Sequence, residues 1–561
     1  MLKYKILISV FFFIISARIN SQVVYEHVKN NNIYEFLDEL ANNQVISLNS
    51  CIKPYSRILI AEKLTEAELK IDELNKRQKE ELQFYLKSFS LETENELDFP
   101  KRFDISKKNK NLATALNPIG MFYKDSFATF SLKPIWGIQY WSNKNGNVFH
   151  RWGGLEASGY LGKHLAFYAN LRDNYESELL TSPTFFNQRQ GAPMKGGDNG
   201  GFDYSEMRGG ITYSWNWGSL GLIKDHLQWG SNYNGANILS GRQPSYAMIK
   251  LNLKPVKWFE FNYFHGWLVS EVVDSSRSYW NGDIYRAVFY PKFLAANMFT
   301  FIPWKRLNVS IGNSVVYSDV FQAAYLIPFM FFKSIDHTLN ATYSKGQAGQ
   351  NSQMFFDISS RQIKHLHLYA TLFVDEFSVK RLSKPDEMNF LSYKIGFRLS
   401  DFPIENLNLT SEYSIVNPLV YQHNISTTTF ESNNYNLGYY LGDNSQEFYL
   451  AVEYKPLSRL HFNLSFNFAQ HGLDHVYDNS YSDNLDKLTL LENITWQNRT
   501  FALKTNYEFV NNAYVFLYFI KSNIQGYDIE NETAKYYLNK RTPKIFQGDN
   551  FTVSFGFNIG F

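Results

Sequence analysis

Few side chains in this sequence have the spacing that catalytic or metal-binding groups require. His365 and His367, in KHLHLYATLF, are two residues apart, so in a strand both imidazoles would share a face and could ligate a metal ion. No third ligand accompanies them in the sequence, which favours a place on the wall of a water-filled interior. Asp375 and Glu376, in LFVDEFSV, are adjacent, so in a strand their carboxylates face opposite sides and cannot form a catalytic pair.

Sequence motifs of common enzymes are missing as well. There is no G-x-S-x-G nucleophile turn and no phosphate-binding loop, and the glycine-rich stretch GAPMKGGDNGGFDY lacks the required strand-to-helix setting. Cys51 is the only cysteine, so neither a disulfide nor a cysteine-based metal site can form within one chain. The formal charge of +2 gives no sign of nucleic-acid binding. We therefore expect no enzyme activity, no cofactor, no metal site and no nucleic-acid partner.

The last residues, NFTVSFGFNIGF, show the pattern of a membrane-crossing strand. Apolar side chains alternate with small or polar ones from Phe551 to Phe561, which is the period of a strand. These eleven residues suffice to cross a bilayer at a tilt, and they exceed the usual strand of a soluble sandwich, which is the alternative. A final strand ending in Phe resembles the closing strand of bacterial outer-membrane barrels. This resemblance implies that Phe557 and Phe561 are read by the barrel assembly machinery.

Similar strands recur through most of the chain. In RLHFNLSFNFAQ the apolar and polar residues alternate strictly, and YAMIKLNLKP, KWFEFNYFHGW, RLNVSIGNSVVYS and LSYKIGFRLS follow the same rule. The composition, 17% aromatic with 48 Phe and 38 Tyr, fits strands that face lipid on one side and water on the other.

The connections between these strands indicate the topology. Tight turns alternate with long polar stretches, as expected for the periplasmic and extracellular ends of an outer-membrane barrel. Eight turns join sixteen strands; an opening strand near PIWGIQYWSN and the closing strand give about 18 antiparallel strands, with sixteen as the alternative. The turns are LGKH (161–164), WGSL (217–220), KPVK (254–257), IPWK (302–305), RQIK (361–364), DFPIEN (401–406), KPLS (455–458) and WQNR (496–499).

The region before the barrel has a different pattern. Residues 1–21 have basic residues before a short apolar run and end at a cleavage position, which predicts an export signal peptide. Residues 22–95 show helical periodicity and predict a small periplasmic α-helical module, either a cap on the barrel mouth or a binder of peptidoglycan or another periplasmic partner. Residues 96–124 are expected to be a charged linker, and residues 125–561 the outer-membrane β-barrel.

Several stretches resemble the Wzi-like capsule assembly proteins of Gram-negative outer membranes. The clearest is KDHLQWGSNYNGANILSGRQPSYAMIKL (224–251), with its W-G-x-x-x-N-G core and Leu-Ser pair. Others are YFHGWLVSE, NVSIGNSVVYSDVFQAAYLIPFMFF, LFVDEFSV, TSEYSIVNPLVYQH and NLGYYLGDNSQEFYLAVEYKP. Together they span roughly residues 150–470. The resemblance implies an eighteen-stranded barrel in outer-membrane lipid that helps to assemble or retain capsular polysaccharide.

Long loops rich in aromatic and planar polar residues could bind sugars, because aromatic faces pack on sugar rings and amides or guanidinium groups fix hydroxyls. The candidates are Trp229, Tyr233, Asn234 and Arg242. Their alternative role is to brace the loop at the barrel mouth. The expected function is non-enzymatic assembly or attachment of surface polysaccharide; the alternatives are a passive outer-membrane channel and a structural adaptor in an envelope complex.

Overall fold

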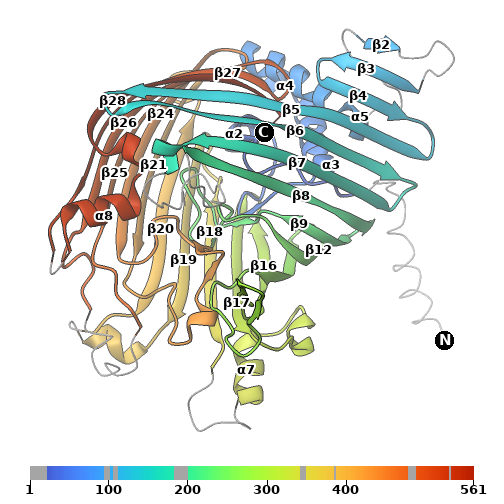
Figure 1. Ribbon diagram of the computed structural model, residues 1–561. Helices are drawn as coiled ribbons and strands as arrows, with labels where there is room; N and C mark the ends of the chain where they lie inside the picture. Colours follow the sequence, from blue (N-terminus) through green and yellow to red (C-terminus); the bar gives the residue numbers. More distant parts are fainter. Residues whose placement is uncertain are drawn as a thin grey trace, which may run out of the picture.

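Figure 1 shows the computed structural model of the chain. The structure describes residues 22–93, 102–104, 111–181, 200–340, 349–384, 387–477, 488–529 and 532–560. The expected export signal (1–21), most of the glycine-rich stretch and Phe561 lie outside the described residues.

The main element is a closed antiparallel barrel of 18 strands, as the sequence predicted. Each strand pairs with the next along the chain, so the ring follows the sequence. In ring order the strands are β5 (Ala128–Asn143), β6 (Gly146–Leu161), β7 (Leu165–Ser177), β8 (Gly201–Trp215), β9 (Gly218–Asp225), β12 (Tyr246–Val256), β13 (Phe259–Leu268), β16 (Lys292–Trp304), β17 (Leu307–Ser318), β18 (Asn351–Ser360), β19 (Leu366–Glu376), β20 (Phe390–Ser400), β21 (Leu407–Val416), β24 (Ser445–Leu457), β25 (Leu460–His471), β26 (Trp496–Val510), β27 (Ala513–Gly526) and β28 (Gly548–Ile559).

The closing strand β28 seals the ring against β5, with Val553 opposite Ser142 and Ile559 opposite Trp136. The other half of the same β5 edge pairs with β4 (Ile119–Lys124), which continues into β3 (Leu112–Leu116) and β2 (Arg102–Asp104). This small extension stands beside the barrel in Figure 1. Strands therefore occur in the stretch expected to be a linker, whereas the proposed domain division itself stays a prediction.

Seven of the eight expected tight turns lie at strand junctions, all at one end of the barrel. The expectation for WQNR is wrong, because Trp496 begins β26 and the chain turns at Asn511 and Asn512. Asn512 has φ +60°, the left-handed conformation that Asn tolerates in tight turns. The strand total still agrees, since one turn was misplaced and none was added.

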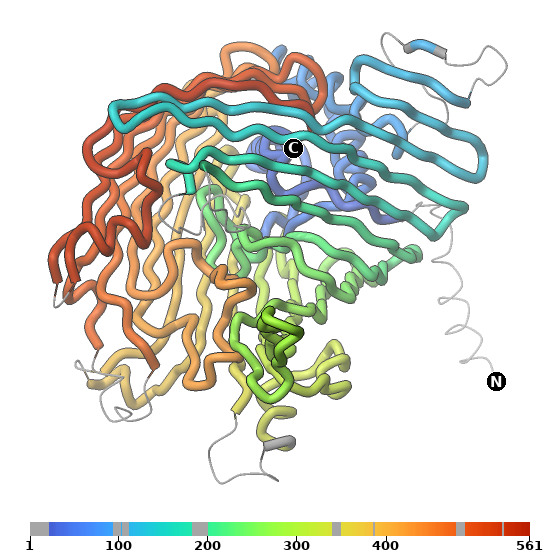
Figure 2. Tube along the Cα trace, viewed as in Figure 1, coloured from blue at the N-terminus to red at the C-terminus, as the bar shows by residue number. Residues whose placement is uncertain are grey.

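Long connections lie at the opposite, extracellular end. Several contain short elements of their own, and Figure 2 shows the connections between β13 and β16 and between β17 and β18 as compact folds of the trace below the strands. These elements are α6 (Glu178–Thr181), β14 (Tyr279–Asn281), β15 (Ile284–Arg286), η2 (Ala323–Leu326), α7 (Phe332–Asn340), η3 (Val379–Ser383), η4 (Ser426–Thr428), β22 (Glu431–Ser432), β23 (Tyr435–Asn436), α8 (Ala534–Arg541) and η7 (Lys544–Phe546).

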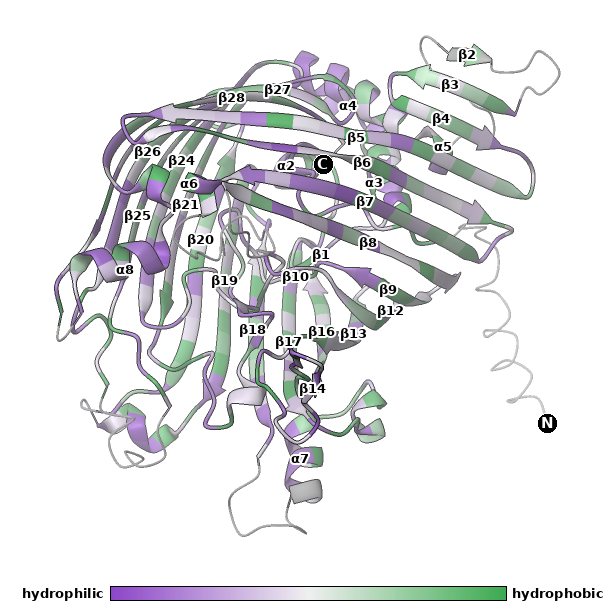
Figure 3. Cartoon of the chain, viewed as in Figure 1, coloured by the Kyte–Doolittle hydropathy of each residue, from purple (hydrophilic) through white to green (hydrophobic). Residues whose placement is uncertain are grey.

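The two faces of the barrel wall are inverted relative to a soluble protein. On β25 the outward Phe462 and Leu464 are 36% and 55% exposed, whereas the inward His461 and Asn467 are buried. Figure 3 shows the same alternation of green and purple along the strands. Such an apolar outer band places the strands in a bilayer. Among the described residues, no helix is both long and apolar enough to cross one.

The helical module forms a compact core of its own at the turn end of the barrel. Its elements are α2 (Asn31–Asn42), α3 (Arg57–Glu68), η1 (Ile71–Glu73), α4 (Lys76–Ser88) and α5 (Ser90–Thr93). Ser56 caps α3 by accepting the Leu59 N–H, and Asn75 forms a capping box with Gln78 at the start of α4. The helices bury Phe36, Leu37, Leu40, Ile60, Leu64 and Leu82 between them.

Buried polar contacts fix this module to the barrel. Lys455 Nζ, near the turn end of β24, lies 2.9 Å from Glu39 Oε2 of α2, and Arg361 Nη2 lies 2.7 Å from Asp38 Oδ1. The strand preceding α3 enters the lumen, where the Cys51 thiol lies 3.6 Å from Met298 Sδ of β16. The module is thus a plug in the periplasmic mouth, with one segment inserted deep into the barrel.

Candidate functional site

The connection between β9 and β12, residues 226–245, turns into the lumen. It contains β10 (Gln228–Trp229) and β11 (Leu239–Ser240), which form a three-stranded sheet with β1 (Ile52–Lys53) of the plug. Ile52 pairs with Trp229, and Trp229 pairs with Leu239. We call residues 226–245 the inward loop. The sequence predicted this loop at the barrel mouth; the structure places it inside.

Two of the four expected sugar-binding residues are packed within this arrangement. The Trp229 side chain is 1% exposed, and its ring lies edge-on to Phe264 and Phe355 at centroid distances of 5.3 and 5.9 Å. Asn234 donates its side-chain amide to Glu447 Oε2 at 3.0 Å. Neither side chain lines the large lumenal cavity described below, and both hold the inward loop in place.

The other two expected residues do line that cavity. The Tyr233 hydroxyl lies 2.8 Å from His367 Nδ1, and the Arg398 guanidinium lies 4.7 Å from the centre of the Tyr233 ring. The Arg242 guanidinium lies 5.2 Å from the ring centre of Tyr440. The structure therefore brings Tyr233 and Arg242 to one space.

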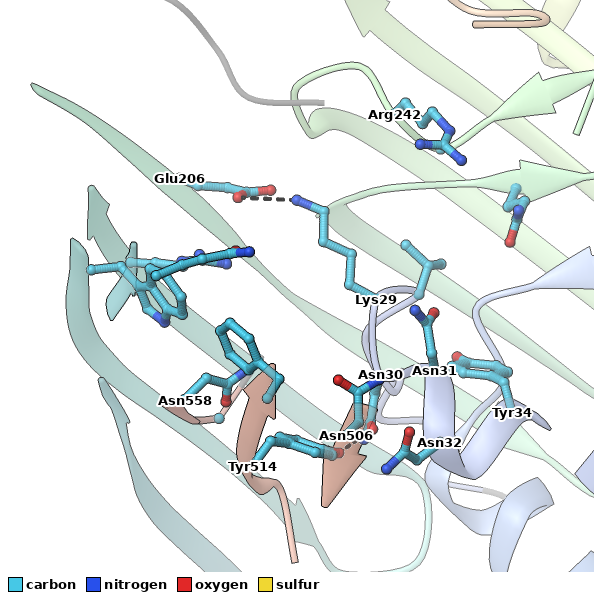
Figure 4. A pocket seen from close by; sticks show the side chains of 18 of the residues that line it. Lys29, Asn30, Asn31, Asn32, Tyr34, Glu206, Arg242, Asn506, Tyr514 and Asn558 are labelled. Carbon is cyan, nitrogen blue, oxygen red and sulfur yellow. Dashed lines mark hydrogen bonds and ion pairs between the residues drawn. The ribbon is translucent and has the colours of Figure 1, made fainter. Parts of the chain in front are cut away.

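This cavity has a volume of about 530 Å³ and lies between the plug and one side of the barrel wall. The wall side comes from β5 to β8 and from β26 to β28; the other side comes from the start of α2 and from the inward loop. In Figure 4, Asn30, Tyr34 and Arg242 stand on the plug and loop side, facing Glu206, Tyr514 and Asn558 on the strands.

Aromatic rings and planar polar groups alternate along the wall. Trp152 lies beneath the Arg172 guanidinium, which is 4.5 Å from its ring centre. His150 Nε2 and Asn174 Oδ1 are hydrogen-bonded at 3.0 Å, and the Tyr204 hydroxyl donates to Glu176 Oε1 at 2.9 Å. Stacking surfaces and directional donors or acceptors are the groups that a saccharide needs.

Charges of both signs face this space. Lys29 Nζ lies 3.8 Å from Glu206 Oε2, an ion pair drawn in Figure 4. Burial lowers the pKa of the Lys29 ammonium, and Glu206 opposes part of that effect. Lys53 Nζ lies 3.9 Å from Asp38 Oδ2 on the plug itself. The mixed lining suits a polar ligand with many hydroxyls better than a ligand of one strong charge.

Glu206 also belongs to a buried cluster with His27 and His226, whose ligand atoms lie within 4.8 Å of one another. His226 Nε2 is 2.6 Å from Glu206 Oε1, and its Nδ1 is 3.0 Å from the Gln243 carbonyl oxygen. His27 Nδ1 accepts the Lys29 backbone N–H at 3.0 Å. Hydrogen bonds and the Lys29 ion pair thus join the cluster to the cavity wall.

The two histidines that were considered as metal ligands are separated. His367 faces the lumen, as expected. In addition to the contact of its Nδ1 with Tyr233, its Nε2 lies 2.8 Å from Ser359 Oγ. His365 lies in the turn before β19 with φ +70°, and its Nδ1 contacts Asn43 Oδ1 of the plug at 3.0 Å. A shared strand face for the pair is therefore wrong, because the turn reorients His365.

Sequence reasoning missed the residues on the cavity wall. A signal was present in YANLRDNYESE, where Asn170, Arg172, Asn174 and Glu176 are polar at every second position of β7. These four residues face inward and are buried. No comparable signal marks Lys29, because a short polar segment before a helix does not reveal that it enters a barrel.

Comparison with solved structures bears on the architecture. No family model and no curated protein matches this chain. Among solved structures, Wzi of Escherichia coli, described as an outer membrane protein involved in group 1 capsule assembly and a carbohydrate binding β-barrel, matches with TM-score 0.55 and 11% identity, covering 96% of this chain and 100% of Wzi. OccAB2 of Acinetobacter baumannii matches with TM-score 0.42 and 9% identity over 78% of this chain and 99% of its own.

At 11% identity the likeness to Wzi concerns the fold. The wall with its apolar outer band, the even strand number and the asymmetry of turns and loops are those of Gram-negative outer-membrane proteins. The expected resemblance is confirmed at this level: the chain has the fold of the Wzi outer-membrane β-barrel.

Proposed function

We propose that this protein is a non-enzymatic outer-membrane barrel that helps to assemble or retain extracellular polysaccharide, and that it holds a saccharide segment in the lumenal cavity. The cavity is the observation that carries the proposal. Its volume of about 530 Å³ is within the range of small-ligand sites, which is roughly 300 to 1,000 Å³.

The lining supports a saccharide as the ligand class. Phe516 and Tyr518, which line the cavity and are partly exposed, offer ring surface, while Asn558 and Gln139 offer amides that can both donate to and accept from hydroxyls. The carbohydrate binding described for Escherichia coli Wzi, which has the same fold, agrees with this assignment. Tyr233 and Arg242 contribute from the inward loop, and Trp229 and Asn234 act by fixing that loop.

A cavity-filling variant tests the proposal. Asn558 lies on the lumenal face of β28 and lines the cavity, so Asn558→Trp should occlude it while the barrel still assembles. The matched control is Phe557→Trp, one residue away on the lipid face of the same strand. Trp229→Ala would be a poor test, because truncating a buried aromatic ring costs about 3 to 5 kcal/mol of stability.

The assay compares cell-attached with shed polysaccharide in a gene deletion, complemented by wild type or by either variant. We expect the deletion and Asn558→Trp to shed polysaccharide, and Phe557→Trp to restore attachment. If the deletion leaves attachment unchanged, the proposed function is wrong. If the deletion sheds polysaccharide and Asn558→Trp restores attachment fully, the function stands and the cavity is not its site.

A passive channel remains the alternative that the width of an eighteen-stranded barrel suggests. It requires a continuous water path, and the plug segment and the inward loop occupy the lumen where that path would run. We therefore expect no large stable conductance from the wild-type protein in planar bilayers. Such a conductance would favour the channel over retention of polysaccharide.

A further inference from the structure

The outer wall of β13, β16 and β17 carries polar groups where lipid is expected. The register places Tyr263, Asn297 and Asn313 side by side in one row across the three strands. They share the outward face with Phe301 and Ile311, which are 39% and 38% exposed. Uncovered amides at this position would be costly, because lipid tails cannot hydrogen-bond them.

This row lies too deep in the membrane for its polar side chains to reach water. Asn297 is seven residues along β16 from Trp304 at the turn end. At a rise of about 3.3 Å per residue and a tilt of about 40°, that is roughly 18 Å along the barrel axis. The apolar band of such barrels is about 25 Å tall, so the row lies within it.

Residues 319–338 after β17 cover this row; we call them the outer-wall lobe. The lobe contains η2 and the described part of α7, which lies beside the end of β17 in Figure 1. Tyr325 and Phe332 are 0% exposed and pack against the wall; the Tyr325 ring centre is 4.7 Å from that of Tyr317. Phe329 stacks on Phe261 at 4.4 Å.

Side chains of the polar row form hydrogen bonds with the irregular backbone of the lobe. The Asn297 side-chain amide donates to the Pro328 and Met330 carbonyl oxygens, both at 2.9 Å. Asn313 Oδ1 accepts the Phe332 N–H at 2.9 Å, and the Tyr263 hydroxyl donates to the Tyr325 carbonyl at 2.8 Å. Irregular backbone is tolerated at membrane depth only when protein groups satisfy it in this way.

The outward surface of residues 320–332 of the lobe is apolar, whereas Asp319 before them and Lys333 and His337 after them are exposed. Residues 320–332, VFQAAYLIPFMFF, contain no charged side chain. The exposed members, with their exposed fractions, are Val320 59%, Phe321 43%, Leu326 36%, Ile327 50%, Phe329 55%, Met330 38% and Phe331 44%. This surface continues the lipid-facing band of the wall that it covers.

We propose that residues 320–332 of the outer-wall lobe are embedded in the bilayer and bind the acyl chains of outer-membrane lipid, so that this part of an extracellular connection belongs to the membrane anchor. Three observations combine in this assignment: the lobe reaches down to Phe261, its backbone is hydrogen-bonded by outward side chains of the wall, and its surface is continuous with the apolar band. A second copy of the chain or a protein partner are the competing occupants.

Spin labelling distinguishes these occupants. In a Cys51→Ala background, single Ile327→Cys and Phe329→Cys variants carry a nitroxide, and the protein is reconstituted in phosphatidylethanolamine and phosphatidylglycerol vesicles. Leu222→Cys, on the exposed outer face of β9, serves as the lipid control, and Lys144→Cys, in the β5–β6 turn, as the water control. Relaxation by oxygen and by a water-soluble nickel chelate is measured at each position.

We expect oxygen to relax the labels at 327 and 329 more strongly than nickel, as at 222, and the reverse at 144. A nickel preference at 327 and 329 would overturn the proposal by placing the lobe in water. Protection from both agents would overturn it by placing a protein there, and spin–spin broadening between copies would identify a second barrel.

A second variant tests the anchoring amides. Asn297→Leu with Asn313→Leu keeps the wall compatible with lipid but removes the hydrogen bonds to the lobe backbone. We expect proteinase K added to vesicles to cut within residues 319–338 at least tenfold faster than in wild type, while heat-modifiable gel migration stays that of a folded barrel. Phe299→Leu, on the same face, is the control. Equal cleavage in the double variant and the control would refute the role of the amides.

Discussion

Lys455→Met tests whether buried charge holds the plug in the barrel mouth. Lys455 and Glu39 side chains are both 0% exposed and 2.9 Å apart. Glu39 also pairs with Arg77. Arg77 pairs in addition with Glu81, with 2.5 Å between Arg77 Nη1 and Glu81 Oε2. Burial alone would raise the pKa of Glu39, but Arg77 and Lys455 together lower it below its usual value, so the carboxylate is ionised.

The magnitude follows from the charges that remain. Without Lys455, the buried carboxylates of Glu39 and Glu81 share the guanidinium of Arg77, which also lies 4.0 Å from Asp401. Removing one partner of a buried ion pair costs about 3 to 5 kcal/mol, which is a factor of roughly 10² to 10³ or more in the folding equilibrium. Glu39→Gln combined with Lys455→Met removes the uncompensated charge, so the double variant should recover most of the loss.

Unfolding by guanidinium in detergent micelles, followed by heat-modifiable migration and tryptophan fluorescence, gives the free energies of the single variants and the double variant. The control is Lys521→Met, which breaks an ion pair with Asp549 whose side chains are 55% and 60% exposed. We expect that control to unfold almost as wild type does, because an exposed ion pair contributes little to stability. A similarly small cost for Lys455→Met, or a double variant less stable than Lys455→Met, would refute an electrostatic attachment of the plug.

Two further variants probe the closing strand and the plug. Phe557→Asp should reduce outer-membrane yield, because a carboxylate on the lipid face is unfavourable; unchanged yield and gel migration would contradict the assigned face. Burial, assisted by the nearby Glu453 carboxylate, raises the pKa of Glu35 from 4.5 to about 7. The folded state therefore keeps a proton that the unfolded chain has lost, so this contribution to stability is present below pH 4.5 and is lost as the pH rises through about 7. Glu35→Gln should be more stable than wild type at pH 8 and indistinguishable at pH 4; equal melting at pH 8 would contradict the shift.

The barrel could be predicted from local patterns, because each strand carries its own period of two and each turn its own residue types. The one misplaced turn illustrates the limit of such patterns. WQNR has the polarity of a turn, yet Trp496 pairs with His471 and Gly526 as part of β26. The adjacent asparagines 511 and 512 were the better signal, since Asn tolerates the left-handed conformation that Asn512 adopts.

The interior could not be predicted in the same way, because it depends on pairing between distant segments. Ile52 and Trp229 lie far apart in the sequence and meet only because the plug and the inward loop enter the lumen from opposite ends. The inward loop contains the aromatic and amide residues of a sugar-binding surface, and nothing local in it shows that Trp229 is core while Tyr233 and Arg242 line a cavity.

Departures from the barrel pattern nevertheless carry information about what packs against each face. In KFLAANMFTFIPW of β16, the inward positions Leu294, Ala296 and Met298 are apolar, although a water-filled lumen would favour polar side chains there. The outward position between Ala295 and Phe299 is Asn297, although lipid would favour an apolar one. Each exception has its partner in the structure: the inward residues pack on the plug segment around Cys51, and Asn297 holds the outer-wall lobe. A strand whose sequence is apolar inward and polar outward therefore indicates a stretch of barrel wall that protein covers on both sides.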